Sequence, residues 1–164
     1  MIIKNILSLE ERNAIKKDFD SGIENTTKSQ FKEYGIKNIY NLESTIPYLE
    51  SLKYVFEEKI GIELLSVNTY MRKYSKGTRL TPHTDKAKLD VTISIQIDKS
   101  DAIVNPLILH TDPKTILNLE NGDAGIILYG NRILHERPVL KSDWMYNLFL
   151  HYSFKSSQFE KKLI

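Results

Sequence analysis

The sequence contains no cysteine among its 164 residues. A disulfide framework, a thiolate nucleophile and a cysteine-ligated zinc site are therefore excluded. Long apolar runs are also missing, because no stretch approaches the roughly 18 apolar residues that a membrane-spanning helix needs. Residues 1–9 hold only a short apolar run, without the small-residue cleavage site of a signal peptide. The absence of cysteine fits a reducing compartment, and together these features predict a cytoplasmic protein with no membrane partner.

The sequence also has little net charge, since 23 lysines and arginines face 21 aspartates and glutamates for a formal charge of +2. This charge is too close to neutral to indicate a nucleic-acid partner, and we do not expect one. The hydrophobic fraction of 41% is that of an ordinary globular chain, and the length predicts one domain over residues 1–164. The sequence leaves the oligomeric state open.

Helix signals are confined to the first third of the chain. Ser8 and Glu11 have the spacing of a capping box, so we expect a helix from there to about Phe19 and a loop over the polar residues 20–28. A second helix is predicted from about residue 45 or 46 to residue 60. Pro47 suits the first turn of this helix, and Gly61 suits its end.

Beyond Gly61 the chain changes to short segments rich in β-branched and aromatic residues, separated by turn signals such as Lys76-Gly77 and Asn121-Gly122-Asp123. The expected strands are residues 62–74, 91–97, 107–110, 116–119, 125–129 and 145–154. Strands at this spacing favour a sandwich or barrel. The predicted fold is α+β, a double-stranded β-helix (jelly roll) over residues 62–154. Residues 1–61 would be mainly helical support packed on one sheet.

The most informative residues are His83 and Asp85. Pro82 biases Thr81 toward an extended backbone, and residues i and i+2 of an extended strand project to one face. A third ligand should come from a distant strand, and His135 follows the predicted strand 125–129. Two histidines and one carboxylate on one side of a metal leave open coordination positions, which is typical of non-haem iron(II) oxygenases.

The wider pattern resembles the 2-oxoglutarate/iron(II) oxygenase superfamily, and it is most similar to small members like the catalytic domain of prolyl 4-hydroxylases. The matching features are Tyr74 and Gly77, Leu80-Thr-Pro-His83-Thr-Asp85, residues 91–97, Gly122-Asp123, His135-Glu-Arg137-Pro and residues 148–152. The resemblance implies that His83, Asp85 and His135 bind Fe(II), with 2-oxoglutarate as cosubstrate and dioxygen as oxidant. It implies hydroxylation of an unactivated C–H bond, with succinate and carbon dioxide as coproducts.

In that superfamily a basic residue about ten positions beyond the distal histidine binds the far carboxylate of 2-oxoglutarate. This sequence departs from the pattern, because residues 144–147 include no basic side chain. Arg137 is the first substitute, since it would share a strand face with His135 and could pair with a carboxylate through two hydrogen bonds.

Arg72 is the second choice, because Tyr70, Arg72 and Tyr74 alternate onto one face of an earlier strand, and Lys141 is the third. The resemblance makes Tyr74 and Tyr70 candidates for a hydrogen bond to the cosubstrate.

Two other functions use the same residues. A zinc-dependent hydrolase could employ the three ligands and a metal-bound water, and a non-catalytic jelly-roll module could retain a vestigial site. The substrate of the oxygenase could be a small molecule, an amino acid or a prolyl peptide, because specificity in such folds depends on the surrounding loops.

Overall fold

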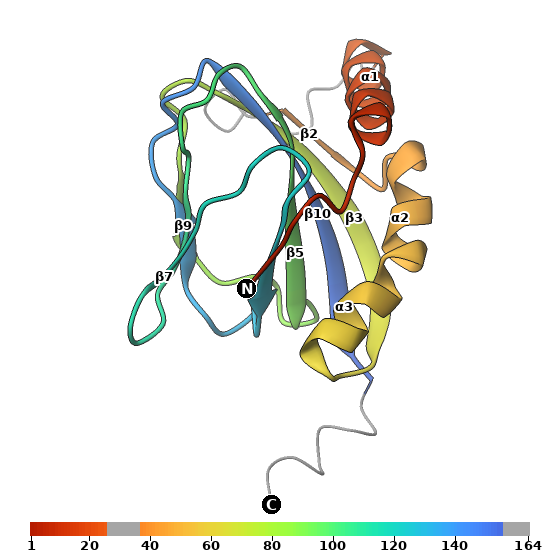
Figure 1. Ribbon diagram of the computed structural model, residues 1–164, viewed down its shortest axis with the longest axis vertical. Coiled ribbons are helices and arrows are strands. Elements are labelled where there is room, and N and C mark those ends of the chain that lie inside the picture. Colours follow the sequence, from red (N-terminus) through yellow and green to blue (C-terminus); the bar gives the residue numbers. More distant parts are fainter. Residues whose placement is uncertain (26–36, 156–164) are drawn as a thin grey trace, which may run out of the picture.

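The structure is a computed structural model that describes residues 1–25 and 37–155. Its strands form two antiparallel sheets, and the larger one lies between the smaller sheet and the helices (Figure 1). The larger sheet has the order β1-β8-β5-β10-β3-β2, with β1 Ile2–Ile3, β2 Lys37–Tyr40, β3 Leu64–Ser75, β5 Val91–Lys99, β8 Ala124–Leu128 and β10 Trp144–Phe154. The smaller sheet has the order β4-β9-β6-β7, with β4 Leu80–His83, β6 Leu107–Leu109, β7 Thr115–Leu117 and β9 His135–Arg137. This double sheet confirms the predicted jelly-roll core.

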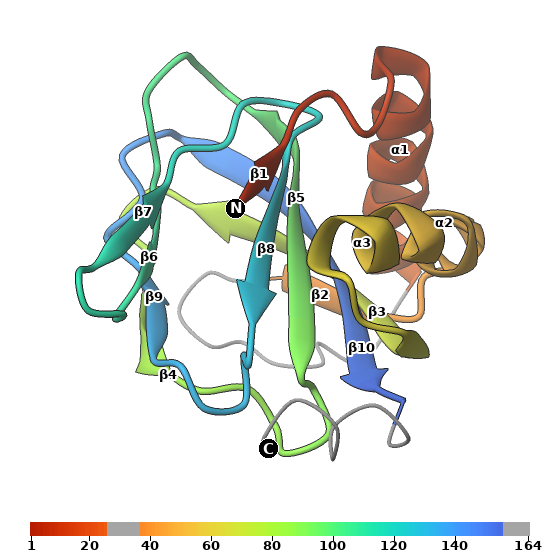
Figure 2. The ribbon, with the colours of Figure 1, turned by 60° about the horizontal axis from the view of Figure 1, so that its bottom comes forward.

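The helices cover the outer face of the larger sheet, which confirms their predicted position (Figures 1 and 2). They are α1 Leu9–Asn25, α2 Ile46–Ser51 and α3 Lys53–Ile60, with a 3-10 turn at Glu43–Thr45 before α2. Within the described ranges, none of them has both the length and the apolar character that crossing a bilayer requires.

The first helix is longer than predicted. Its capping box forms as expected, because the Ser8 amide donates to Glu11 Oε2 at 2.7 Å and the Glu11 amide donates to Ser8 Oγ at 3.2 Å. The expected loop is wrong for residues 20–25, which continue α1, and its last part lies outside the described residues. The reason is that Ile15, Phe19 and Ile23, spaced by four, all pack on the core, so the apolar stripe runs on.

The second predicted helix is divided at Leu52, whose backbone stays helical (φ −84°, ψ −13°). Residues 46–60 are therefore two short helices that meet at a bend. Gly61 ends α3 in the left-handed region (φ 69°), and its amide donates to the Glu57 carbonyl at 2.8 Å, as its position predicted.

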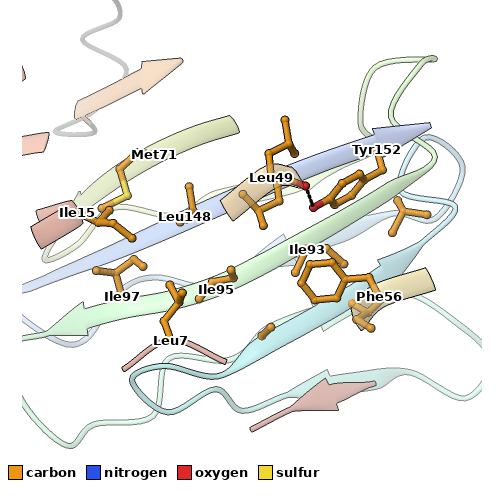
Figure 3. Close-up of a cluster of buried hydrophobic side chains, with 14 of the residues drawn as sticks. Leu7, Ile15, Leu49, Phe56, Met71, Ile93, Ile95, Ile97, Leu148 and Tyr152 are labelled. Atoms are coloured by element: carbon orange, nitrogen blue, oxygen red, sulfur yellow. Dashed lines mark hydrogen bonds between the residues drawn. The ribbon is translucent and has the colours of Figure 1, made fainter. Parts of the chain in front are cut away.

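The main core lies between the helices and the larger sheet (Figure 3). Its members include alternate residues of β5 and β10, together with helix residues: Ile15, Phe19, Phe56, Val91, Ile93, Ile95, Ile97, Leu148, Leu150 and Tyr152. The intervening residues Thr92, Ser94 and Gln96 are buried as well, so β5 is covered on both faces. Because strand side chains alternate, these three polar residues face the space between the two sheets, where the candidate site lies.

Residues 1–61 contribute strands as well as helices, which the sequence did not predict. β1 pairs with β8, and β2 pairs with β3 through Lys37↔Lys73 to Tyr40↔Tyr70. Two- and four-residue strands are too short to show a period of two, so no sequence pattern marked them. Their consequence for the site is that β2 brings Tyr40 to the cavity described below.

Candidate metal centre

His83, Asp85 and His135 come together at one point of the smaller sheet. Asp85 Oδ1 lies 3.6 Å from His135 Nε2 and 4.0 Å from His83 Nε2, and the two imidazole rings are 4.4 Å apart between centroids. One nitrogen or oxygen from each residue lies within 4.8 Å of the others. These three groups, predicted from the sequence as a metal site, could therefore hold one ion between them.

Each histidine is oriented by the backbone carbonyl two residues before it. His83 Nδ1 donates to the Thr81 carbonyl at 2.9 Å, and His135 Nδ1 donates to the Ile133 carbonyl at 2.9 Å. A carbonyl only accepts hydrogen bonds, so Nδ1 carries the proton in both rings and the Nε2 lone pair faces Asp85. This is the arrangement that a metal-binding histidine uses, with one nitrogen for the ion and the other fixed by an outer partner.

The charges of the three groups fit the same use. Burial lowers the pKa of His83 and favours its neutral, metal-binding form. Burial also lowers the pKa of His135, but the nearby Asp85 carboxylate outweighs it and leaves the pKa above its ordinary value. For Asp85 burial raises the pKa, while His135 and the Thr92 hydroxyl outweigh burial and hold it below its usual range. A metal ion at this point would bind the two Nε2 lone pairs and the carboxylate, and would compete with protons for them.

The position of Asp85 differs from the prediction of a strand carrying both ligands. β4 ends at His83, and its register places His83 opposite His135 on β9. Asp85 lies beyond the strand, where its amide donates to the Gly130 carbonyl at 2.8 Å and its Oδ2 accepts from Thr92 Oγ1 at 2.6 Å. Thr92 therefore occupies one carboxylate oxygen and leaves Oδ1 for an ion.

The triad opens into a cavity of about 510 Å³. The residues that line it come from both sheets and include the three candidate ligands. The others are Tyr40, Val67, Asn68, Tyr70, Arg72, Leu80, Thr84, Lys86, Ala87, Lys88, Leu89, Thr92, Leu107, Ile127, Arg137, Phe149 and His151. Lys141, the third candidate for a cosubstrate anchor, is exposed and is absent from this lining.

Arg137 is buried, with 2% of its surface exposed, two residues beyond His135 on β9. Its Nη1 donates to the Asn105 carbonyl at 2.9 Å and its Nη2 lies 3.5 Å from Ser94 Oγ, while Nε has no partner among the described residues. It makes no ion pair with a carboxylate there, and burial lowers its pKa. A buried guanidinium with an unused N–H fits an anionic ligand entering from the cavity.

The other predicted cosubstrate residues surround Arg137. Arg72 Nη2 donates to the Tyr70 hydroxyl at 2.7 Å, and both residues line the cavity. Tyr74 is buried behind them, with Arg72 and Arg137 guanidinium carbons 5.5 and 5.9 Å from its ring centroid. The Tyr74 hydroxyl has no hydrogen-bond partner within the described ranges. Arg72, Arg137, Tyr70 and Tyr74 thus lie beside one another, although Tyr74 does not line the cavity itself.

Solved structures share this architecture. A 2OG-Fe(II) oxygenase family oxidoreductase from Burkholderia pseudomallei superposes with a TM-score of 0.76 at 12% identity, covering 93% of this chain and 83% of that one. A prolyl-4-hydroxylase from Pseudomonas putida gives 0.72 at 12% identity, with 95% and 92% covered. HygX from Streptomyces hygroscopicus, with nickel and 2-oxoglutarate bound, gives 0.68 at 9% identity, with 93% and 82% covered. The chain has the fold of the 2OG-Fe(II) oxygenases.

The likeness to 2OG-Fe(II) oxygenases is one of fold. No protein-family model and no curated protein sequence matches the chain. The same fold is found in an epimerase and a carbocyclase of nogalamycin biosynthesis, so it does not by itself select the reaction.

Three residues around this site were not predicted from the sequence as parts of it. Thr92 and Gly130 position Asp85 through contacts between separate segments, and no local pattern marks such contacts. His151 lines the cavity, with its Nδ1 2.6 Å from Asn68 Oδ1, and burial lowers its pKa to about 4. A signal for His151 did exist, because alternation along β10 places it on the same face as Phe149.

Proposed function

We propose that this chain is an Fe(II)- and 2-oxoglutarate-dependent dioxygenase that hydroxylates an unactivated C–H bond of a small molecule, an amino acid or a prolyl peptide. The observation that carries the proposal is the triad itself, in which two Nε2 lone pairs and one carboxylate oxygen face one another at the wall of a cavity. We also propose that residues 1–164 act as a single oxygenase domain.

The residues present fit both groups. His83, Asp85 and His135 would hold Fe(II) through a mixed nitrogen and oxygen set without thiolate, and this set suits non-haem iron. Arg137, with its unused Nε, would pair with the far carboxylate of 2-oxoglutarate, and Tyr74 would offer its unpartnered hydroxyl nearby. When bound, the iron and cosubstrate use dioxygen to place one oxygen atom in the C–H bond and the other in succinate, with release of carbon dioxide.

The protein's own contribution is positioning. The Thr81 and Ile133 carbonyls fix the two rings, and Thr92 fixes the carboxylate, so the ligands need little rearrangement to bind an ion. Leu80, Leu107 and Ile127 line the cavity and limit water near the metal centre. Support for the substrate range comes from the related folds, which include a prolyl-4-hydroxylase and HygX with hygromycin B bound.

The test is cosubstrate turnover. The purified protein, loaded with Fe(II) under anoxia, should bind 2-oxoglutarate and show a visible metal-to-ligand charge-transfer band. Admission of oxygen should then release carbon dioxide from labelled 2-oxoglutarate, and candidate substrates should raise the rate. His135→Ala should lose both signals, whereas His110→Ala, a histidine outside the cavity lining, should keep them.

Absence of both binding and decarboxylation would refute the oxygenase. Oxygen-independent hydrolysis that requires zinc would instead identify the hydrolase. A function that survives His83→Ala would identify a binding module.

A further inference from the structure

The cavity holds two arginines that lack a carboxylate partner. Arg72 and Arg137 both line it, and neither forms an ion pair with any carboxylate of the described residues. Each also keeps a buried Nε–H without a hydrogen-bond partner in the same part of the chain. Arg137 is buried and Arg72 is half-buried. Removing a guanidinium from water is costly unless an anion pairs with it, so each arginine favours an anionic ligand.

The cosubstrate has only one carboxylate that would not bind the metal, so it can pair with only one of the two arginines. Of the two carboxylates of 2-oxoglutarate, one belongs to the keto acid end that chelates the metal, and the other would pair with Arg137. Iron, Asp85 and 2-oxoglutarate together sum to a charge of −1 (+2 − 1 − 2), which Arg137 brings to zero. Arg72, Lys86 and Lys88 remain, and the lining contains no second carboxylate among the described residues to balance them.

Arg72 also stands in a different setting from Arg137. Its guanidinium carbon lies 4.9 Å from the centroid of the Tyr70 ring, which stacks on Tyr40 at 4.3 Å and approaches Phe149 at 6.0 Å. Lys86 Nζ lies 5.9 Å from the Tyr40 ring centroid, at the same wall. Tyr40, Tyr70 and Phe149, here called the aromatic wall, all line the cavity. Arg72 is thus a cation beside an apolar surface, and Arg137 is a cation among buried polar groups.

We propose that the substrate is a small organic carboxylate that places its carboxylate on Arg72 and its apolar body along the aromatic wall. The inference rests on the proposed function, because it assigns Arg137 to the cosubstrate and leaves Arg72 for the substrate. The same lining disfavours the ammonium group of a free amino acid. It holds four cationic side chains, two arginines and two lysines, and its one carboxylate, Asp85, would be bound to the metal.

The test measures binding rather than turnover. The full-length protein is loaded with Mn(II) and saturating 2-oxoglutarate under anoxia, and calorimetry compares three acids with their amides: phenylacetate, benzoate and butyrate. We expect at least one acid to bind about tenfold or more tightly than its amide. Arg72→Met should abolish that difference, Arg72→Lys should retain part of it, and the exposed Arg132→Met should leave it unchanged.

Cosubstrate binding distinguishes failure of this inference from failure of the proposed function. Arg137→Met should weaken 2-oxoglutarate binding about tenfold or more, while Arg72→Met should leave it nearly unchanged. If both substitutions weaken it equally, the two arginines grip one cosubstrate carboxylate and the inference fails. It also fails if no acid exceeds its amide, or if the acids displace 2-oxoglutarate. If the unaltered protein does not bind 2-oxoglutarate at all, the oxygenase proposal itself falls.

Discussion

Gly130 packs directly against the Asp85 carboxylate. A Cβ added at this position would lie 2.6 Å from Asp85 Oδ2 and 3.3 Å from Thr92 Oγ1. Gly130→Ala should therefore push the carboxylate away from the two histidines, and we expect divalent-metal affinity to fall about tenfold or more. Titration with Mn(II) or Ni(II) would measure the loss.

Gly22→Ala is the matched control. Its added Cβ would meet Ile39 Cδ1 at 3.0 Å, the end of a flexible side chain far in sequence from the metal ligands, and alanine suits a helix interior. Metal affinity should be unchanged in this variant. Unaltered affinity in Gly130→Ala, with circular dichroism showing an intact fold, would mean that Asp85 does not need its present position.

Among single residues, the sequence predicted those site residues that lie close to one another along the chain. His83 and Asp85 are two positions apart, as are His135 and Arg137, so strand geometry was enough to pair them. The sequence could not predict the hydrogen bonds that Asp85 makes with Thr92 and Gly130, because they join segments that are separate in the chain. The sequence ranked Arg137 before Arg72, but it could not show that both reach one cavity from different sheets.

At the scale of elements, Tyr152 joins helix α2 to strand β10. Its hydroxyl donates to the Leu49 carbonyl at 2.8 Å, inside the main core (Figure 3). Tyr152→Phe removes the donor and leaves a buried carbonyl unpaired, so we expect the free energy of unfolding to fall by about 1–3 kcal/mol. Urea denaturation would measure it. Tyr54→Phe, at a tyrosine that is 67% exposed, should change stability little, and an equal loss in both variants would contradict this role.

Asp123 ties the first residues of the chain to the turn before β8. It accepts hydrogen bonds from Lys4 Nζ at 2.7 Å, the Asn5 amide at 3.2 Å and the Glu120 amide at 3.0 Å. Burial raises the pKa of Asp123, but these donors outweigh burial and hold it below its usual value. A carboxyl whose pKa is lower in the folded state stabilises the fold above its unfolded pKa, and this stabilisation is lost as pH falls through the folded pKa.

Asp123→Asn should accordingly be less stable than the unaltered protein at neutral pH, by about 1–2 kcal/mol. The difference should shrink below about pH 4, where the unaltered carboxyl also becomes protonated. Thermal unfolding across pH would measure the gap. Asp143→Asn, which removes an exposed pair with Lys76, should cost less than about 1 kcal/mol. If the stability difference between Asp123→Asn and the unaltered protein grew as pH fell, Asp123 would not stabilise the fold as a carboxylate.

The elements that the sequence predicted well are those with long, regular patterns. β5 and β10 were found within about two residues, because each is a long run rich in β-branched or aromatic residues that is buried on both faces. The extent of α1 was underestimated, since Asp20 and Ser21 suggested a loop while Ile23 continued the buried stripe. β1 and β2 were missed because pairing with a neighbouring strand, rather than their own composition, makes them strands.

At the scale of the whole molecule, ligands should stabilise the fold. The metal and the cosubstrate would each bind a site that exists only when residues 83, 85 and 135 are assembled. A ligand at 100 times its dissociation constant adds about 2.7 kcal/mol to the free energy of unfolding. We expect the melting temperature to rise with Ni(II) and to rise again with 2-oxoglutarate, and neither shift should occur in His83→Ala. A shift with 2-oxoglutarate in the absence of metal would show that the two sites are independent.

The register of the smaller sheet predicts that metal binding slows its local opening. His83 ends β4 and His135 begins β9, so an ion bound by both would link two short strands across their only histidine pair. Such a link would stabilise the pairing of the two strands. Backbone amides of β4 and β9 should therefore exchange with deuterium faster in metal-free protein than in metal-loaded protein. The large sheet, closed by its own core, should exchange alike in both. The metal supply would then set the local stability of this edge of the smaller sheet.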